Sequence, residues 1–166
     1  MKKICCIILS MSLLCFIFIG CANSEDAIKT IEEIKNTAEI SVSDAYDKLA
    51  QYNSNNAEIA DYRQELLELK NCEGTYSQDG KYEAKIEIQL KYGEYWMNIE
   101  YDNYTGTIDE AKLEKDGQDG FLYKARTEGI HVNIFGNIGQ PEFEIRLSQE
   151  KLYISWGGGH YYLTKI

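Results

Sequence analysis

The stretch YEAKIEIQLKY, residues 82–92, alternates apolar and polar side chains without an exception. Positions 82, 84, 86, 88, 90 and 92 carry tyrosine or aliphatic side chains, and the positions between them carry charged or amide side chains. Strict alternation is typical of a strand in an antiparallel sheet that buries one face. A chain built around this stretch therefore has an antiparallel sheet as its framework.

The residues after this stretch predict a hairpin. Gly93-Glu94 is a Gly-X pair suited to a two-residue type II′ turn, which would pair Tyr92 with Tyr95 and Leu90 with Met97. Every pair in this register is apolar on the same face. Because a slip by one residue would turn one strand's apolar set to the opposite face, we expect this register to be well specified.

Similar alternation recurs to the end of the chain, between short turns rich in glycine and acidic residues. It predicts strands at 74–77, 104–115 with a bulge near Asp109-Glu110, 121–126, 130–134, 143–147, 152–156 and 161–165, hence about eight or nine strands in all. A meander of this length tends to close, because closure removes exposed edges. We therefore expect a small up-and-down barrel whose last strand returns to the first. An open curved sheet packed on helices and a sandwich are the alternatives.

A compositional boundary near residue 73 separates this sheet from a helical segment. Every glycine except Gly20, the single proline and both tryptophans lie from Gly74 onward. Within 27–72, apolar residues recur at helical spacing, and Ser41 and Asn55 have the form of helix starts. We predict two or three amphipathic helices that either cap the sheet or form an interaction module. The fold class is thus α+β, with a helical segment at 27–72 and a barrel or sheet domain at 73–166.

The N-terminus has the anatomy of a signal peptide over residues 1–20, with a basic start followed by an apolar run. Phe18-Ile19-Gly20-Cys21 resembles the lipobox of bacterial lipoproteins. This resemblance implies cleavage before Cys21, a diacylglycerol on its thiol, and a lipidated tether over 21–26. The protein would then face outside the cytoplasm on the cell membrane or outer membrane. An uncleaved membrane anchor and ordinary secretion are the alternatives.

A second resemblance lies at the start of the sheet. Gly74-Thr75-Tyr76 follows the helical segment and is similar to the Gly-x-Trp that opens the first strand of lipocalins and their calycin relatives, with Tyr76 in place of tryptophan. The resemblance covers residues 74–166 and implies a ligand cavity inside the barrel.

Charge and motif content limit the chemistry. The chain carries a net charge of −10, so a nucleic-acid partner is not expected. Cys72 is the one cysteine left after processing and lipidation, which excludes an internal disulfide. His131 and His160 lie in no metal-ligand spacing, and the acidic turn at 116–120 lacks the pattern of a calcium loop. We therefore expect no metal, no cofactor and no catalytic residues.

The stretch SWGGGHYY supplies the remaining candidates for a ligand site. Trp156, His160, Tyr161 and Tyr162 lie near one glycine-rich turn, where they could stack on a sugar or an aromatic ligand. Alternatively, Trp156 belongs to the core, because it is in phase with the apolar residues before it. We expect a non-catalytic lipoprotein with an interaction or envelope role and a possible protein partner. The alternatives are a small apolar or aromatic ligand inside the barrel, and carbohydrate contact through Trp156, Tyr161 and Tyr162.

Overall fold

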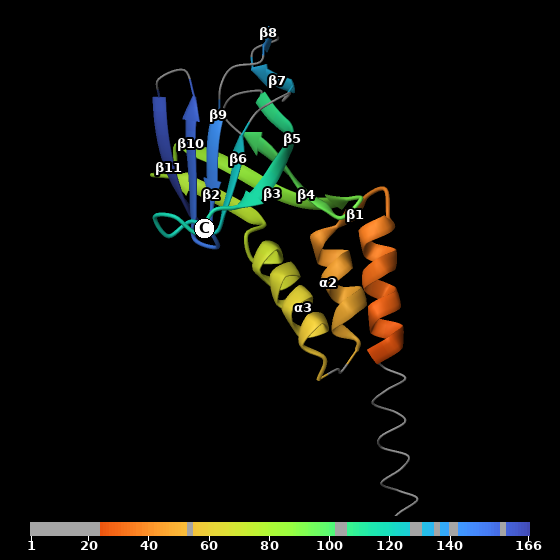
Figure 1. Cartoon of the computed structure of the whole chain (residues 1–166). Helices are drawn as coiled ribbons and strands as arrows, with labels where there is room; N and C mark the ends of the chain where they lie inside the picture. The colour runs from red at the N-terminus through yellow and green to blue at the C-terminus, as the bar shows by residue number, and fades with distance from the viewer. Residues whose placement is uncertain are drawn as a thin grey trace, which may run out of the picture.

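The computed structural model describes residues 24–52, 55–101, 106–126, 131–134, 137–139, 143–156 and 159–166. It shows helices grouped at one end of a closed antiparallel sheet, which confirms the α+β prediction (Figure 1). The predicted signal peptide and Cys21 lie outside the described residues. Within the described part of the chain, no helix combines the length and the apolar character needed to cross a bilayer.

The helical part consists of residues 24–36, helix α2 (Val42–Ala50) and helix α3 (Ala57–Lys70). Helical structure is therefore already present at residues 24–26, within the expected tether. Each helix buries one stripe of side chains at helical spacing: Ala27, Ile31 and Ile34 in the first, Val42, Ala45 and Leu49 in the second, and Ile59, Leu66 and Leu69 in the third. Burial of these stripes holds the helices together and against the sheet.

Both internal helix starts are fixed by side-chain caps. The Ser41 hydroxyl accepts a hydrogen bond from the Asp44 backbone N–H at 3.0 Å, as expected for the predicted start. The predicted cap at Asn55 is wrong by one residue. Asn56 has the extended backbone of a cap, and its Oδ1 accepts from the Glu58 N–H at 2.9 Å.

The strands form one antiparallel sheet. They are β1 (Ile40–Ser41), β2 (Gly74–Gln78), β3 (Tyr82–Lys91), β4 (Glu94–Tyr101), β5 (Gly106–Lys115), β6 (Tyr123–Arg126), β7 (His131–Ile134), β8 (Asn137–Gly139), β9 (Phe143–Leu147), β10 (Lys151–Trp156) and β11 (Gly159–Lys165). Strands β2-β3-β4-β5-β6-β9-β10-β11 close into an eight-stranded barrel. The barrel closes where Thr164 pairs with Ser77 and Lys165 pairs with Tyr76, so the last strand does return to the first.

Among the described residues, three short strands lie outside the ring. Strand β1 adds to β3 at Gln89 and Leu90, and the β7–β8 hairpin extends from the start of β5 at Ile108 and Asp109. The sequence did not predict β1 or β8. The closed ring is compatible with the lipocalin-like resemblance at 74–76.

The β3–β4 hairpin has the predicted faces, but the predicted register is wrong. Leu90 pairs with Tyr95 and Ile88 pairs with Met97, two residues away from the expected pairing. The reason is the turn, which is formed by Tyr92 and Gly93 with φ values of 51° and 78°. Two positive φ values define a type I′ turn in place of type II′. A shift by two residues keeps every side chain on its original face, because the side-chain period of a strand is two.

The predicted bulge in β5 is confirmed. Met97 pairs with Ala111 and Ile99 pairs with Ile108, so Asp109 and Glu110 together face one residue of β4. A bulge of this kind bends the strand and increases its twist, which helps a short sheet to close.

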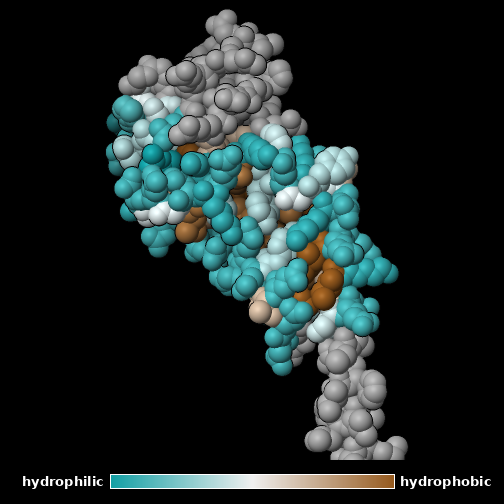
Figure 2. All heavy atoms as spheres, in the orientation of Figure 1, coloured by the Kyte–Doolittle hydropathy of each residue, from teal (hydrophilic) through white to brown (hydrophobic). Residues whose placement is uncertain are grey.

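The barrel core is continuous with the helical core. Inward side chains from all eight strands of the ring pack in one buried cluster with the helical stripes and Cys72. Helix α3 covers one end of the barrel, where Glu65 pairs with Lys115 at 3.1 Å and the buried Tyr76 lies just beyond the helix end. The face of the molecule in Figure 2 is mainly hydrophilic, with one apolar patch over the helical part and smaller apolar areas on the barrel.

Candidate functional site

Aromatic and charged side chains gather on the outer face of β9, β10 and β11. Tyr153 in β10 pairs with Arg146 of β9 on one side and with Tyr162 of β11 on the other. Leu152 and Ile154, on either side of Tyr153, are buried in the core. Because successive side chains of a strand point to opposite faces, the row Arg146-Tyr153-Tyr162 faces away from the barrel interior.

Tyr153 is the centre of an aromatic cluster. Its ring centroid lies 4.8 Å from that of Tyr162, 6.1 Å from the stacked ring of His160 and 6.5 Å from that of Phe121. A hydrogen bond of 2.8 Å joins the Tyr153 hydroxyl to His160 Nδ1. These contacts fix the Tyr153 ring, whereas Tyr162 is 65% exposed.

Arg146 gathers carboxylates beside the aromatic cluster. Its guanidinium lies 2.8 Å from Glu144 Oε1 and 3.1 Å from Asp119 Oδ2, and its Nε lies 3.9 Å from Asp116 Oδ2. The hydrogen bond to Glu144 is the largest cause that raises the pKa of Arg146. Asp119 belongs to the acidic turn at 116–120, so this turn supplies a partner for an arginine.

The two groups line one groove, which we call the outer groove. It has a volume of about 500 Å³ and is lined by Asp119, Phe121, Glu144, Arg146, Lys151, Tyr153 and Tyr162. Such a volume falls within the range of small-ligand sites. The outer groove offers aromatic faces, hydrogen-bond donors and carboxylate acceptors on one surface.

The four site residues predicted from SWGGGHYY do not all lie on the same face of the sheet. His160 and Tyr162 belong to the outward phase and join the Tyr153 cluster. Tyr161 pairs with Ile154 in the inward phase, and its ring centroid lies 6.3 Å from that of Tyr82. The backbone of Trp156 pairs with Gly159, while its side chain lies outside the described residues.

The remaining residues of the outer groove were not predicted from the sequence. Phe121, Arg146 and Tyr153 are far apart along the chain, and only the strand register brings them together. A signal was present for Tyr153, because it lies in the polar phase of its strand, where a large aromatic side chain is unusual.

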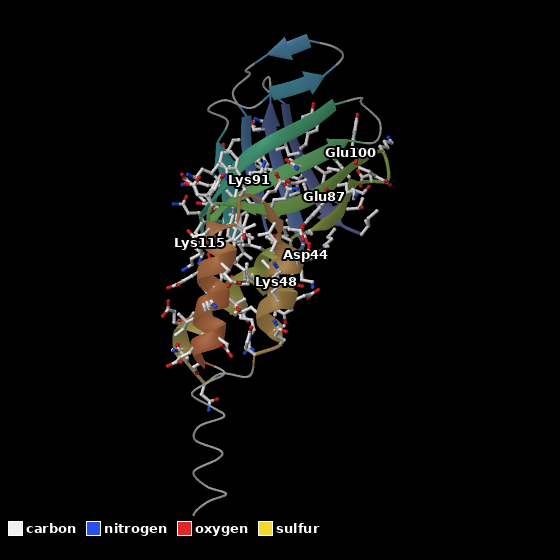
Figure 3. All side chains as sticks on the ribbon, turned by 90° about the vertical axis from the view of Figure 1, so that its right-hand side faces the viewer. Asp44, Lys48, Glu87, Lys91, Glu100 and Lys115 are labelled. Carbon is white, nitrogen blue, oxygen red and sulfur yellow. The ribbon has the colours of Figure 1, made fainter. Side chains whose placement is uncertain are left out.

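A second hollow, of about 440 Å³, lies beside α2 and is lined by Ile40, Asp44, Asp47, Lys48 and Gln51. It has no aromatic lining. Figure 3 shows Asp44 and Lys48 on this helix and shows Glu87 and Glu100 on the outside of the sheet, where they face solvent. This side of the molecule is a solvated surface of mixed charge.

Buried and partly buried titratable groups gather where α3 meets the barrel. Burial is the main cause that raises the pKa of Tyr62 to about 12 and the pKa of the Cys72 thiol to about 12, and it also raises the pKa values of Tyr95 and Tyr123. All four groups therefore stay protonated at neutral pH, and Cys72 is not a thiolate nucleophile. Among the described residues, no cluster of His, Cys, Asp and Glu side chains is placed to hold a metal ion.

No protein-family model matches this sequence, and neither a curated protein nor a solved structure gives a significant match.

Proposed function

We propose that this chain is a lipid-anchored, non-catalytic interaction protein of a bacterial cell envelope, facing outside the cytoplasm, with the outer groove as its contact surface. The observation that carries this proposal is the position of the helical part. Residues 24–36 are helical, and the start of this helix lies at the end of the molecule opposite the barrel (Figure 1). Only two residues separate the lipobox-like Cys21 from residue 24.

This arrangement suits a protein attached at Cys21. A link of three residues reaches about 10 Å at most, so the helices would lie next to the bilayer. A helix over 24–36 is about 20 Å long and would hold the barrel away from the lipid headgroups. The outer groove, on the barrel wall, would then be open to partners in the surrounding envelope.

The non-catalytic part of the proposal is supported by the state of the reactive side chains. Cys72 is buried with a protonated thiol, and the Nδ1 atom of His160 is occupied by Tyr153. Cys72 therefore lacks the thiolate that covalent catalysis by cysteine uses.

A lipocalin-like role, with a small apolar or aromatic ligand inside the barrel, is the alternative. The closed eight-stranded ring favours it. The contiguous packing of the inward side chains with the helices favours a barrel that serves as a scaffold. Carbon-13 spectra of the methyl groups of Ile88 and Leu152 would separate the two roles, because an apolar ligand in the interior would shift both.

Intact-protein mass spectrometry on the membrane fraction tests the anchor. We expect a chain that begins at Cys21 and carries a diacylglycerol, and we expect the Cys21→Ala variant to lose both the lipid and the cleavage. A full-mass chain in the membrane would indicate an uncleaved anchor. A trimmed chain without lipid in the medium would indicate ordinary secretion, and either result would contradict the proposal.

A further inference from the structure

We propose that the ligand of the outer groove is a neutral carbohydrate, with a pyranose ring against Tyr162 and Tyr153 and its hydroxyl groups bonded to the charged side chains around them. This inference rests on the proposed function only in taking the outer groove as the contact surface. It names the class of ligand that the groove accepts.

The charge of the groove indicates a neutral ligand. Its lining holds two carboxylates, Asp119 and Glu144, and two cations, Arg146 and Lys151. These charges balance, although the whole chain carries −10. A cation would find both carboxylates already paired with Arg146, and an anion would be repelled by the acidic surface of the molecule. A ligand without charge neither competes with Arg146 for the carboxylates nor is repelled by the acidic surface.

The hydrogen-bonding groups suit hydroxyls. A sugar hydroxyl both donates and accepts, and the groove presents carboxylate acceptors beside ammonium and guanidinium donors. Arg146 holds Glu144 at 2.8 Å and Asp119 at 3.1 Å, so both carboxylates are oriented before any ligand arrives. Hydrogen bonds to charged groups are stronger than those between neutral groups, and pre-oriented groups lose less entropy when a ligand binds.

The aromatic rings provide the apolar contact with the sugar. Tyr162 is 65% exposed, although it lies beside the Tyr153 ring, which is also in contact with the stacked ring of His160. An exposed aromatic face next to a rigid partner offers apolar contact with little loss of side-chain freedom. The C–H face of a pyranose ring supplies a flat apolar surface of matching kind, while its edges remain polar.

A peptide is less well suited to this surface. Extended peptides commonly bind by adding a strand to an open sheet edge. Strand β9 is paired with β6 and β10, and β10 is paired with β9 and β11, so the two strands that carry Arg146 and Tyr153 offer no free edge. Recognition over β9 and β10 must therefore come from side chains, as the row Arg146-Tyr153-Tyr162 allows.

Isothermal titration of the full lipidated protein tests the inference. The protein is held in a zwitterionic detergent without sugar headgroups, and the probes are the neutral tetrasaccharides chitotetraose, cellotetraose and maltotetraose. We expect at least one probe to bind with a dissociation constant of about 1 mM or lower. Tyr162→Ala and Glu144→Gln should each weaken that binding about tenfold or more, a loss of about 1.4 kcal/mol.

A matched control comes from the same barrel. Tyr92 is 72% exposed in the β3–β4 turn, away from β9–β11, so Tyr92→Ala should leave binding unchanged. Equal melting temperatures of the variants would exclude a folding defect. The inference is overturned if none of the three probes binds, or if Tyr162→Ala and Glu144→Gln both bind like the unmodified protein.

Failure of this inference is distinguishable from failure of the proposed function. A lipidated chain that binds no tetrasaccharide would keep the anchored role and remove carbohydrate as the ligand. An unlipidated chain that binds through Tyr162 would keep the carbohydrate site and remove the anchor.

Discussion

The carboxylate of Glu73 replaces a missing strand partner of Ile88. Its Oε1 accepts a hydrogen bond from the Ile88 backbone N–H at 3.0 Å. Strand β2 pairs with β3 only as far as Ile86, and β1 pairs from Gln89 onward, so this N–H lies in the gap between the two partner strands. The other oxygen of Glu73 accepts from Ser43 Oγ at 3.0 Å, which ties the sheet to α2.

Removal of this carboxylate should weaken the fold. In Glu73→Ala, the Ile88 N–H and the Ser43 hydroxyl both lose their partner, and we expect the free energy of unfolding to fall by about 1–3 kcal/mol. Urea unfolding followed by circular dichroism would measure it. Glu114→Ala, an exposed glutamate on the barrel wall, is the control and should change stability by less than about 0.5 kcal/mol. Equal effects of the two substitutions would contradict the role of Glu73.

Two buried tyrosines should respond differently to loss of their hydroxyls. The Tyr76 hydroxyl lies 2.8 Å from the carbonyl oxygens of Cys72 and of Ser148 and can donate its proton to either. Tyr123 is equally buried, but its hydroxyl has no hydrogen-bond partner among the described residues. Tyr76→Phe should therefore cost about 1–2 kcal/mol, whereas Tyr123→Phe should be neutral or stabilising. Thermal unfolding of both variants checks the difference, and a larger loss in Tyr123→Phe would refute it.

The fold should lose stability at high pH. Burial raises the pKa of Tyr62 from 10.0 to about 12 and also raises those of Tyr76, Tyr95 and Tyr123. Between pH 10 and 12 the unfolded chain therefore binds fewer protons than the folded one, so the unfolding free energy falls as pH rises. Each tyrosine with a raised pKa lowers the unfolding free energy by at most about 1.4 kcal/mol per pH unit. The effect of Tyr62 is smaller, because this residue is partly exposed.

Urea unfolding at several alkaline pH values measures this slope, and tyrosinate absorbance reports the ionisation directly. Tyr62→Phe should make the slope shallower, because one of the contributing protons is gone. A stability that stays constant over this range, or full ionisation of the folded protein near pH 10, would disagree with the burial of these hydroxyls.

The β3–β4 turn offers a stabilising substitution. Tyr92 has φ of 51°, in the left-handed region that asparagine tolerates better than tyrosine, and the following Gly93 completes a type I′ turn. Tyr92 is 72% exposed, so its side chain contributes little burial. Tyr92→Asn should raise the unfolding free energy by about 0.5–1 kcal/mol, seen as a higher melting temperature. Gly93→Ala, at φ 78°, should lower it.

Alternation of apolar residues was sufficient to predict most of the barrel. It located the strands from 74 to 165, the buried face of each long strand and the bulge at Asp109-Glu110, because each of these features follows from side-chain period within one strand. It missed β1 and β8, since two or three residues carry no clear period. It also misplaced the β3–β4 register, because Gly93 fits two turn types and a shift by two residues preserves both faces.

The outer groove was only partly predictable. Their position near a turn predicts His160 and Tyr162 as site residues, and both contact Tyr153 in the aromatic cluster. The same position predicts Tyr161, which lies in the other phase of β11. Proximity in sequence does not separate the two faces of a strand, and it carries no information about the neighbouring strands.

The sequence by itself determined the class of this protein: a helical segment followed by an antiparallel sheet, with the faces of the sheet assigned. Periodicity encodes these properties locally, within one strand or helix. Only the tertiary structure decided which strands are neighbours. Pairing of β10 with β9 and β11 places Arg146, Tyr153 and Tyr162 in one row. Strand β2 begins at Gly74, opposite Ile86, and the Glu73 carboxylate just before it replaces a strand partner for Ile88. These relationships depend on register between distant segments, which is fixed by closing the barrel around a shared core.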